Sequence, residues 1–344
     1  IKTKSDGLRG TLKESIDLDN HTGNVRHDDE TLVKFHGMYV QDDRDRRAER
    51  AAKKLDKLYS FMIRLRIPGG VINANQWIAT HEISEQFGTG TLKITTRQTV
   101  QLHGLLKHQL RPTIQAFNTA KLDSIAACGD VNRNVIVSSH PQISAIHQQI
   151  YEYADKISTL LLPKTQSYYE VFIDGEKIYE RSSEADPLYE DRYLPRKFKI
   201  AIAIPPSNDV DVFTNDIGLI AIIENDVLKG FNIAIGGGLA TTHGNPNTYS
   251  RLGSIIGFTD TEEKTLKAVY EILTVQRDFG NRIDRKLSRL KYTVDKLTVE
   301  GFKKELESRI GFEFEPERKF KFTERSDRFG WEQNHQGKWF YTLF

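Results

Sequence analysis

Arginine and lysine alternate with apolar residues in four stretches of this 344-residue chain, and cations in that arrangement can bind an anionic ligand. The stretches are 61–67, 91–103, 132–137 and 196–204. The alternation predicts β-strands, because successive side chains of a strand point to opposite faces of the sheet. Each stretch would then present cations on one face and a packed apolar layer on the other. We interpret the cationic faces as the floor of a pocket for a strongly anionic ligand.

These stretches hold most of the candidate binding residues. The candidates are Arg64 and Arg66 in the first stretch, Lys93, Arg97, Gln101 and His103 in the second, Arg133 in the third, and Lys197 and Lys199 in the fourth. By strand alternation, the side chain of Arg196 would point to the opposite face from those of Lys197 and Lys199. Three of the stretches contain no Asp or Glu, whereas a merely solvated face normally mixes both signs. A solvated face remains the alternative for any single stretch, since lysine and arginine are mostly exposed in proteins.

The overall charge makes these faces a local feature of the chain. Lys and Arg number 49 and Asp and Glu 47, which leaves a net charge of +2. Nucleic-acid-binding domains usually carry a basic excess throughout, so the composition argues against that class. No apolar run reaches the length of a membrane span. The single cysteine, Cys128, excludes an intramolecular disulfide framework and predicts a reducing, cytoplasmic setting.

The elements expected around these stretches predict an α+β fold. Alternating strands and helices over residues 56–125 are typical of a ferredoxin-like unit. Helices are expected at 41–57, 73–87, from Pro112, 143–161, 261–277, 282–294 and 298–309, and hairpins at 216–235 and 330–344. Residues 1–40 are expected to be extended. The basic residues between 277 and 291 would form one cationic helix face, for which a solvated surface is the alternative.

Three further features remain ambiguous in the sequence. Gly236–Gly238 follows a predicted strand, where it could bring backbone N–H groups close to a ligand or simply form a tight turn. His103 and His243 lack a partner at metal-ligand spacing, so we expect hydrogen-bonded histidines rather than a metal site. Cys128 is expected to be a small buried residue, because nothing in the sequence places a base beside it.

Seven motifs, in order along essentially the whole chain, resemble the hemoprotein (beta) subunits of assimilatory NADPH-dependent sulfite reductases. The motifs lie at 34–47, 64–70, 95–104, 130–134, 194–199, 235–239 and 276–285. The resemblance implies a siroheme joined through a cysteine thiolate to a 4Fe–4S cluster. It also implies the six-electron reduction of sulfite to sulfide, in sulfate assimilation and cysteine biosynthesis, with electrons from an NADPH-oxidising flavoprotein (alpha) subunit.

The resemblance further implies roles for individual residues. Four residues match the family's cations that bind sulfite and help to deliver protons, namely Arg64, Arg133, Lys197 and Lys199. Those at positions that line or neutralise the carboxylates of siroheme are Lys93, Arg97, Gln101, His103, Arg196 and Arg289. Lys93 stands where relatives often carry arginine, and Arg196 would reach the cofactor only if its strand begins irregularly.

The resemblance divides the chain into four segments. They are an extended arm with a charged helix at 1–55, a ferredoxin-like half-domain at 56–125, a siroheme- and sulfite-binding α+β domain at 126–310, and a linker with the first hairpin of a truncated second half-domain at 311–344. The four cluster cysteines of the family are expected beyond Phe344, because a cluster needs four thiolates and this chain has one cysteine. We therefore expect this portion alone to bind neither cofactor stably and to reduce no sulfite.

Three other interpretations remain open at this point. A siroheme nitrite reductase would have similar sites, although the segment 41–47 favours the NADPH-dependent sulfite type. A nucleic-acid-binding module would need stacking aromatics among the cations, and Phe198 is predicted to point away from Lys197 and Lys199. The third is an interaction protein without catalytic activity on the same scaffold.

Overall fold

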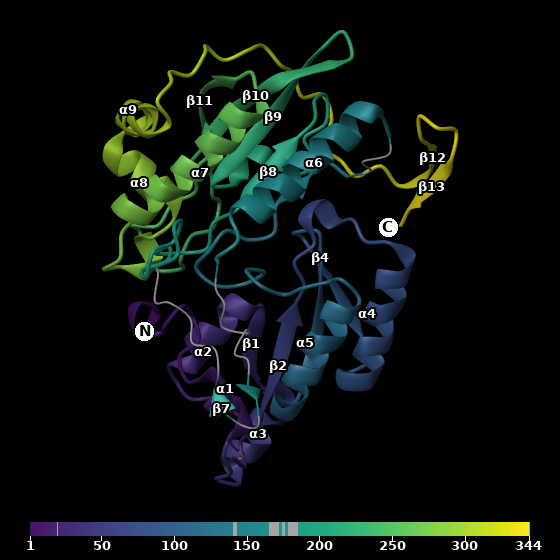
Figure 1. Ribbon diagram of the computed structural model, residues 1–344, viewed down its shortest axis with the longest axis vertical. Coiled ribbons are helices and arrows are strands. Elements are labelled where there is room, and N and C mark those ends of the chain that lie inside the picture. The colour runs from purple at the N-terminus through teal and green to yellow at the C-terminus, as the bar shows by residue number, and fades with distance from the viewer. Residues whose placement is uncertain (19, 140–142, 165–171, 174–175, 178–184, 344) are drawn as a thin grey trace. The chain divides into compact units, whose positions relative to one another are not determined.

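The chain packs as two compact units, drawn together in Figure 1 and described separately here. The computed structural model describes residues 1–18, 20–139, 143–164, 172–173, 176–177 and 185–343. Unit 1 comprises residues 1–67, 71–131 and 162–193, and unit 2 comprises residues 68–70, 132–161 and 194–344. Both units combine helices with sheet, so the predicted α+β fold is confirmed. The four segments expected from the sequence remain predictions.

Unit 1 is built on a four-stranded antiparallel sheet with strand order β1-β2-β4-β3. Its strands are β1 (Met38–Asp42), β2 (Tyr59–Arg64), β3 (Leu92–Thr95) and β4 (Thr99–Leu105), with a separate small pair, β6 (Phe172–Ile173) and β7 (Glu176–Lys177). Its helices are α1 (Leu12–Asp17), α2 (Asp29–Leu32), α3 (Arg44–Ala52), α4 (Ala74–Phe87) and α5 (Leu110–Thr119). Helix α4 packs against β4 and α5. Its first turn is fixed by a capping box, in which Asn73 and Gln76 each accept the other's backbone N–H.

The stretch 91–103 is not the single strand that its alternation predicted. It folds as β3 and β4, joined by a turn at 96–98. Gln98 takes a left-handed backbone conformation with φ of 51° and donates its N–H to the Thr95 carbonyl over 3.2 Å. The turn places Arg97 outside the sheet. Lys93 consequently lies opposite Gln101 on the neighbouring strand rather than further along the same one.

Unit 2 is built on a mixed five-stranded sheet with order β11-β10-β9-β8-β5. The strands are β5 (Ile136–Val137), β8 (Ile200–Ala203), β9 (Ile217–Glu224), β10 (Val227–Ile235) and β11 (Ser254–Thr259), and a separate hairpin pairs β12 (Gly330–Gln333) with β13 (Trp339–Thr342). Its helices are α6 (Ala145–Leu160), α7 (Glu262–Phe279), α8 (Leu290–Leu297) and α9 (Val299–Ile310). Strand β8 is buried throughout and pairs in parallel with both β5 and β9. It therefore crosses the core of the unit.

Two predictions about helices were wrong. Residues 1–40 contain α1 and α2 instead of an extended arm. The expected cationic helix face between 277 and 291 does not form, because α7 ends at Phe279 and α8 begins at Leu290. The side chain of Asn281 accepts the backbone N–H groups of Ile283 and Asp284, which holds the intervening chain in a turn.

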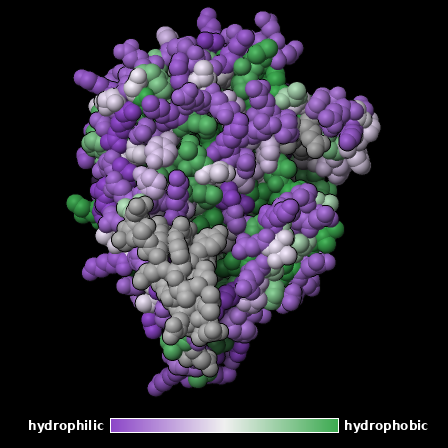
Figure 2. Space-filling model, viewed as in Figure 1, coloured by the Kyte–Doolittle hydropathy of each residue, from purple (hydrophilic) through white to green (hydrophobic). Residues whose placement is uncertain are grey.

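The surface seen in Figure 2 is mostly hydrophilic, with hydrophobic side chains interspersed. Among the described residues, no helix combines the length and the apolar character that crossing a membrane requires. Exposed aromatic side chains occur on the β12–β13 hairpin, where Trp331 and Trp339 are 67% and 64% exposed. Phe344, the last residue of the predicted hairpin, lies outside the described residues.

Candidate functional site

In unit 1, Arg64 forms the centre of a hydrogen-bonded row across three strands. Arg64 on β2 and Lys93 on β3 both lie opposite Gln101 on β4. The Gln101 amide can satisfy both neighbours in only one orientation. In that orientation its oxygen accepts from Nε and Nη2 of Arg64 over 2.9 and 2.6 Å, and its nitrogen donates to Nε2 of His103 over 3.2 Å. Nδ1 of His103 in turn donates to Oε1 of Gln41 over 3.0 Å. The sheet register thus fixes the direction of the Arg64 guanidinium.

The remaining Arg64 nitrogen reaches Cys128. Nη1 lies 3.2 Å from Sγ of Cys128 and 3.5 Å from the Ala127 carbonyl. Cys128 is fully buried, which confirms its prediction as a small buried residue. Its contact with Arg64 was not foreseen, because no sequence signal links two residues so far apart. Arg66, assigned to the same predicted face, instead forms a two-pronged pair with Asp123 over 3.0 and 2.6 Å.

His103 is held as a neutral ring. Burial lowers its pKa, and the positive charges of Lys93 and Arg64 lower it further. A neutral ring fits its two contacts, since one nitrogen accepts from Gln101 and the other donates to Gln41. The row therefore leaves positive charge on Arg64 and on the exposed Lys93. Arg97 lies in the turn between β3 and β4.

In unit 2, three arginines lie around Lys197. Burial lowers the pKa of Lys197 to about 8, and the positive charges of Arg133, Arg289 and Arg196 add to the shift, whereas Asp216 opposes it. Each of these arginines is therefore near enough for its charge to act on Lys197. The structure therefore brings together four of the predicted site residues in this unit.

The backbone before β8 explains how these side chains meet. The expected strand 196–204 is regular only from Ile200, so the parity argument for Arg196 and Lys197 does not apply. Phe198 is 1% exposed, and its carbonyl accepts the N–H of Arg133 over 2.9 Å. This contact places the stretch 132–137 beside the stretch 196–204. The strand therefore begins irregularly, which is the condition under which the resemblance lets Arg196 reach the cofactor.

Asp216 is a site residue that the sequence analysis missed. It is fully buried, and its carboxylate accepts Nε and Nη2 of Arg289 over 3.1 and 2.8 Å. The same carboxylate accepts the backbone N–H of Lys199 over 2.8 Å. The stretches chosen for their cations contain no acid, so they could not reveal it. An aspartate directly before the apolar run 217–223 was the available signal.

The glycines after β10 form a tight turn rather than a phosphate-binding loop. The N–H groups of Gly236, Gly237 and Gly238 donate to backbone carbonyls over 2.8–2.9 Å, so none is directed at a ligand. Gly236 has a φ of 77°, which favours glycine. The buried ammonium of Lys291 donates to the carbonyls of Gly238, Ala240 and Tyr249 and fixes the chain beyond the turn.

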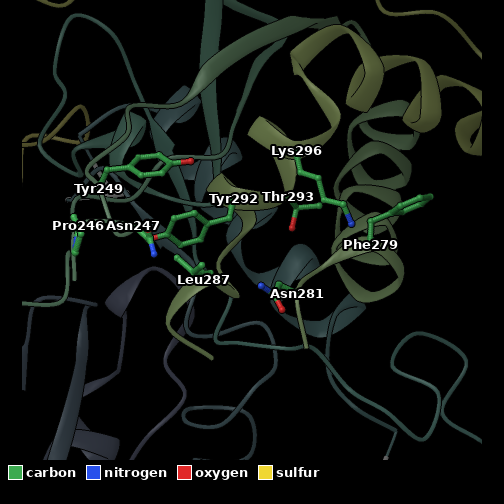
Figure 3. A pocket seen from close by; sticks show the side chains of 9 residues that line it. All are labelled: Pro246, Asn247, Tyr249, Phe279, Asn281, Leu287, Tyr292, Thr293 and Lys296. Carbon is green, nitrogen blue, oxygen red and sulfur yellow. The ribbon is translucent and has the colours of Figure 1, made fainter. Parts of the chain in front are cut away.

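Unit 2 also has an open pocket of about 530 Å³, shown in Figure 3. Its lining residues are Pro246, Asn247, Tyr249, Phe279, Asn281, Leu287, Tyr292, Thr293 and Lys296. None of the predicted site residues lines it, although all of them are described. The predicted site residues thus lie in the cation clusters and not in this pocket.

The described residues fit the two expected cofactors unequally. Arginine and lysine clusters suit the carboxylates of siroheme, because guanidinium groups bind carboxylates through two parallel hydrogen bonds. A 4Fe–4S cluster needs four thiolates, whereas the chain has one cysteine, and that residue is buried against Arg64. The described part of the chain also contains no group of three or more His, Cys, Asp or Glu that could hold a metal ion. A cluster does not fit these residues.

Comparisons with known proteins agree with the resemblance seen in the sequence. Residues 152–314 match the family model "Nitrite and sulphite reductase 4Fe-4S domain", and residues 53–120 match "Nitrite/Sulfite reductase ferredoxin-like half domain". The second match confirms the predicted ferredoxin-like unit. Cys128 lies outside the first match, so that region of this chain contains no cysteine.

Several curated relatives are similar over the whole chain. A protein of Leptospira biflexa named "Sulfite reductase [NADPH] hemoprotein beta-component" is 62% identical over 344 residues, which cover 100% of this chain and 62% of the relative. Proteins of the same name from Bacillus pumilus and Staphylococcus haemolyticus are each 50% identical, with 60% of their length covered. The chain thus spans about three fifths of the length of these relatives.

The fold resembles a solved structure. The structure of the Mycobacterium tuberculosis NirA protein superposes with a TM-score of 0.71 at 21% identity, over 96% of this chain and 58% of that one. At this identity the likeness concerns the fold alone. It supports the α+β architecture described above.

Proposed function

We propose, because the chain belongs to the nitrite and sulfite reductase family, that it forms the anion-binding portion of a sulfite reductase hemoprotein. The whole enzyme would carry out the six-electron reduction of sulfite to sulfide and receive its electrons from an NADPH-oxidising flavoprotein subunit. The names of the relatives at 50–62% identity support sulfite rather than nitrite as the substrate. Because the chain spans only part of those relatives, the activity is proposed for the longer protein.

The observation that supports this proposal most directly is the concentration of positive charge around Lys197 in unit 2. Arg133, Arg196 and Arg289 all act on the charge of Lys197, and Arg289 pairs with the buried carboxylate of Asp216. One pair of opposite charges 4 Å apart in a partly screened site is worth roughly 4 kcal/mol before desolvation. An anion that enters this cluster would therefore offset a repulsion that the folded protein already contains.

Lys197 can also hold and release a proton near neutral pH. Its pKa of about 8 makes the ammonium a better acid than an ordinary lysine. We assign to Nζ of Lys197 the donation of protons to a bound oxyanion. Arg133 stays charged at this pH and would orient the anion through its fork of N–H groups.

We propose the residue roles separately for each unit. In unit 1, Arg64 would bind sulfite, while Lys93, Arg97, Gln101 and His103 would contact siroheme carboxylates. In unit 2, the residues that would bind sulfite are Arg133, Lys197 and Lys199, and those that would contact siroheme carboxylates are Arg196 and Arg289. Siroheme, when bound, supplies the redox chemistry. The 4Fe–4S cluster does not fit this chain, and no step is assigned to it.

A siroheme titration of the 344-residue chain tests this proposal. Absorbance would be followed for the wild type, for Arg196→Met and for the control Lys267→Met, in which an exposed lysine of α7 is replaced. We expect the wild type to bind siroheme only weakly, because the chain lacks the thiolate ligand, and Arg196→Met to bind at least about tenfold more weakly still, a loss of about 1.4 kcal/mol. The control should bind within about twofold of the wild type, because an exposed charge contributes little.

Two results would contradict the proposal. One is a wild-type chain that binds no siroheme at any concentration reached. The other is equal weakening in Arg196→Met and Lys267→Met, which would mean that overall charge rather than the cluster determines binding.

A further inference from the structure

Asp216 lies where four separate elements of unit 2 meet. Its carboxylate binds Arg289, which directly precedes α8, and the backbone N–H of Lys199, which directly precedes β8. Its backbone carbonyl accepts the N–H of Gly236 over 2.9 Å, at the end of β10. The next residue, Ile217, begins β9 and donates its N–H to the Lys199 carbonyl over 3.1 Å. One residue thus fixes both cation-bearing segments to the sheet.

The charge of Asp216 makes its position unexpected for an anion site. A buried carboxylate beside Lys197 repels any incoming anion, and this repulsion is weakly screened because Asp216 is fully buried. Burial of a carboxylate is also costly unless its oxygens are paired. Both oxygens are paired here, with Arg289 and with the Lys199 backbone. The repulsion of an incoming anion and the cost of burying a carboxylate would both be offset if Asp216 held the cations in the geometry that binds the anion.

We propose that Asp216 is a positioning residue, which holds the Arg289 guanidinium and the backbone of Lys199 in the arrangement that receives an anion. It contacts no ligand itself. With its Nε and Nη2 bound to Asp216, Arg289 keeps one orientation. This inference rests on the proposed function, in which Arg289 and Lys199 contact anionic groups.

The sign of the effect of Asp216→Asn distinguishes positioning from simple charge. If the carboxylate acted only through its charge, its removal would tighten anion binding. If it positions Arg289, the amide that replaces it would direct N–H donors at other donors, and the guanidinium would lose its fixed orientation. We expect siroheme affinity of the 344-residue chain to fall roughly 10- to 100-fold, as for other residues that orient a binding group.

A second measurement reports the position of Arg289 without any ligand. In nitrogen-15 NMR spectra of arginine side chains, the Arg289 Nε–H should exchange with water at least about tenfold faster in Asp216→Asn than in the wild type. The control is Asp278→Asn, which removes the same charge from unit 2 but pairs with Arg277 and Arg309. In this control the Arg289 exchange rate and the siroheme affinity should stay within about twofold of the wild type.

Faster exchange together with weaker binding supports the proposal, and any other combination overturns it. Tighter binding would mean that charge outweighs position, and unchanged exchange would mean that Asp216 does not hold Arg289.

If the wild type bound no siroheme, the proposed function would fail, and the Arg289 exchange rate alone would decide the positioning role. If Asp216→Asn did not fold, Arg289→Lys would serve, since it keeps the charge and loses the two-pronged contact. Wild-type siroheme affinity in Arg289→Lys would overturn the proposal.

Discussion

Lys197 shows how a local cluster of cations creates an acid from an ordinary side chain. Burial withdraws water from its ammonium, and Arg133, Arg289 and Arg196 repel the positive charge, in that order of effect. Together they lower its pKa from 10.5 to about 8. The unfolded chain binds this proton more readily than the folded protein does. The contribution of Lys197 to stability therefore rises as the pH increases from about 8 to 10.5.

This account predicts the order of two substitution effects. Arg133→Gln should raise the pKa of Lys197 more than Arg196→Gln does, because Arg133 is the larger source of repulsion. NMR titration of labelled lysine side chains would measure both values. Saturating sulfite should raise the Lys197 pKa as well, so sulfite affinity should decline above about pH 8. A Lys197 pKa that neither arginine substitution changes would contradict the clustering described here.

At the scale of elements, Lys291 stabilises unit 2 through the chain that follows the glycine turn. Its ammonium, on the first turn of α8, donates to carbonyls of Gly238, Ala240 and Tyr249 and lies 5.0 Å from the Tyr292 ring centroid. Burial, followed by the charge of Arg289, lowers the pKa of Lys291. An ammonium that is 2% exposed is tolerated because all these acceptors surround it.

Lys291→Met should therefore lower the free energy of unfolding by about 2–4 kcal/mol, because several buried carbonyls would lose their donor. Urea denaturation measures this loss. Lys296→Met, an exposed lysine on the same helix, should change stability by less than about 0.5 kcal/mol. Equal losses in the two variants would show that the carbonyl contacts of Lys291 contribute nothing specific.

The elements that the sequence predicted well are those with long periodic patterns or clear boundaries. Helix α4 begins after Asn73 as expected, and β9 and β10 pair around Asn225 and Asp226. The hairpin within 91–103 was missed because the alternation of residues continues through its turn. The helix expected at 282–294 begins only at Leu290, because local hydrogen bonds to Asn281 replace helical ones in the residues before it.

The sequence predicted the cations of the candidate site but not the residues that hold them in place. Lys197 and Arg289 were identified by resemblance, and the structure places them in one cluster. The sequence could not reveal Asp216 as a neighbour of Arg289, or Cys128 as a neighbour of Arg64, because those contacts depend on tertiary pairing across 73 and 64 residues. Strand parity also misplaced Arg196, since regular pairing begins only at Ile200.

At the scale of the whole molecule, positive charge is concentrated in two clusters instead of being spread over the chain. The chain has a net charge of +2, yet each unit contains its own cation cluster, around Arg64 in unit 1 and around Lys197 in unit 2. The same chain has one thiol, buried beside Arg64. Its residues therefore suit the binding of anions and lack the ligands for an iron–sulfur cluster.

The most direct test of this account is to load the 344-residue chain with siroheme, add sulfite and a reducing dye, and measure sulfide. The full-length Leptospira biflexa relative, which is 62% identical, serves as the positive control. We predict a siroheme absorbance change that depends on Lys197, without sulfide above the level of free siroheme. Sulfide production by the chain that depends on bound siroheme would contradict the central claim that it binds anions but lacks the residues that complete the reaction.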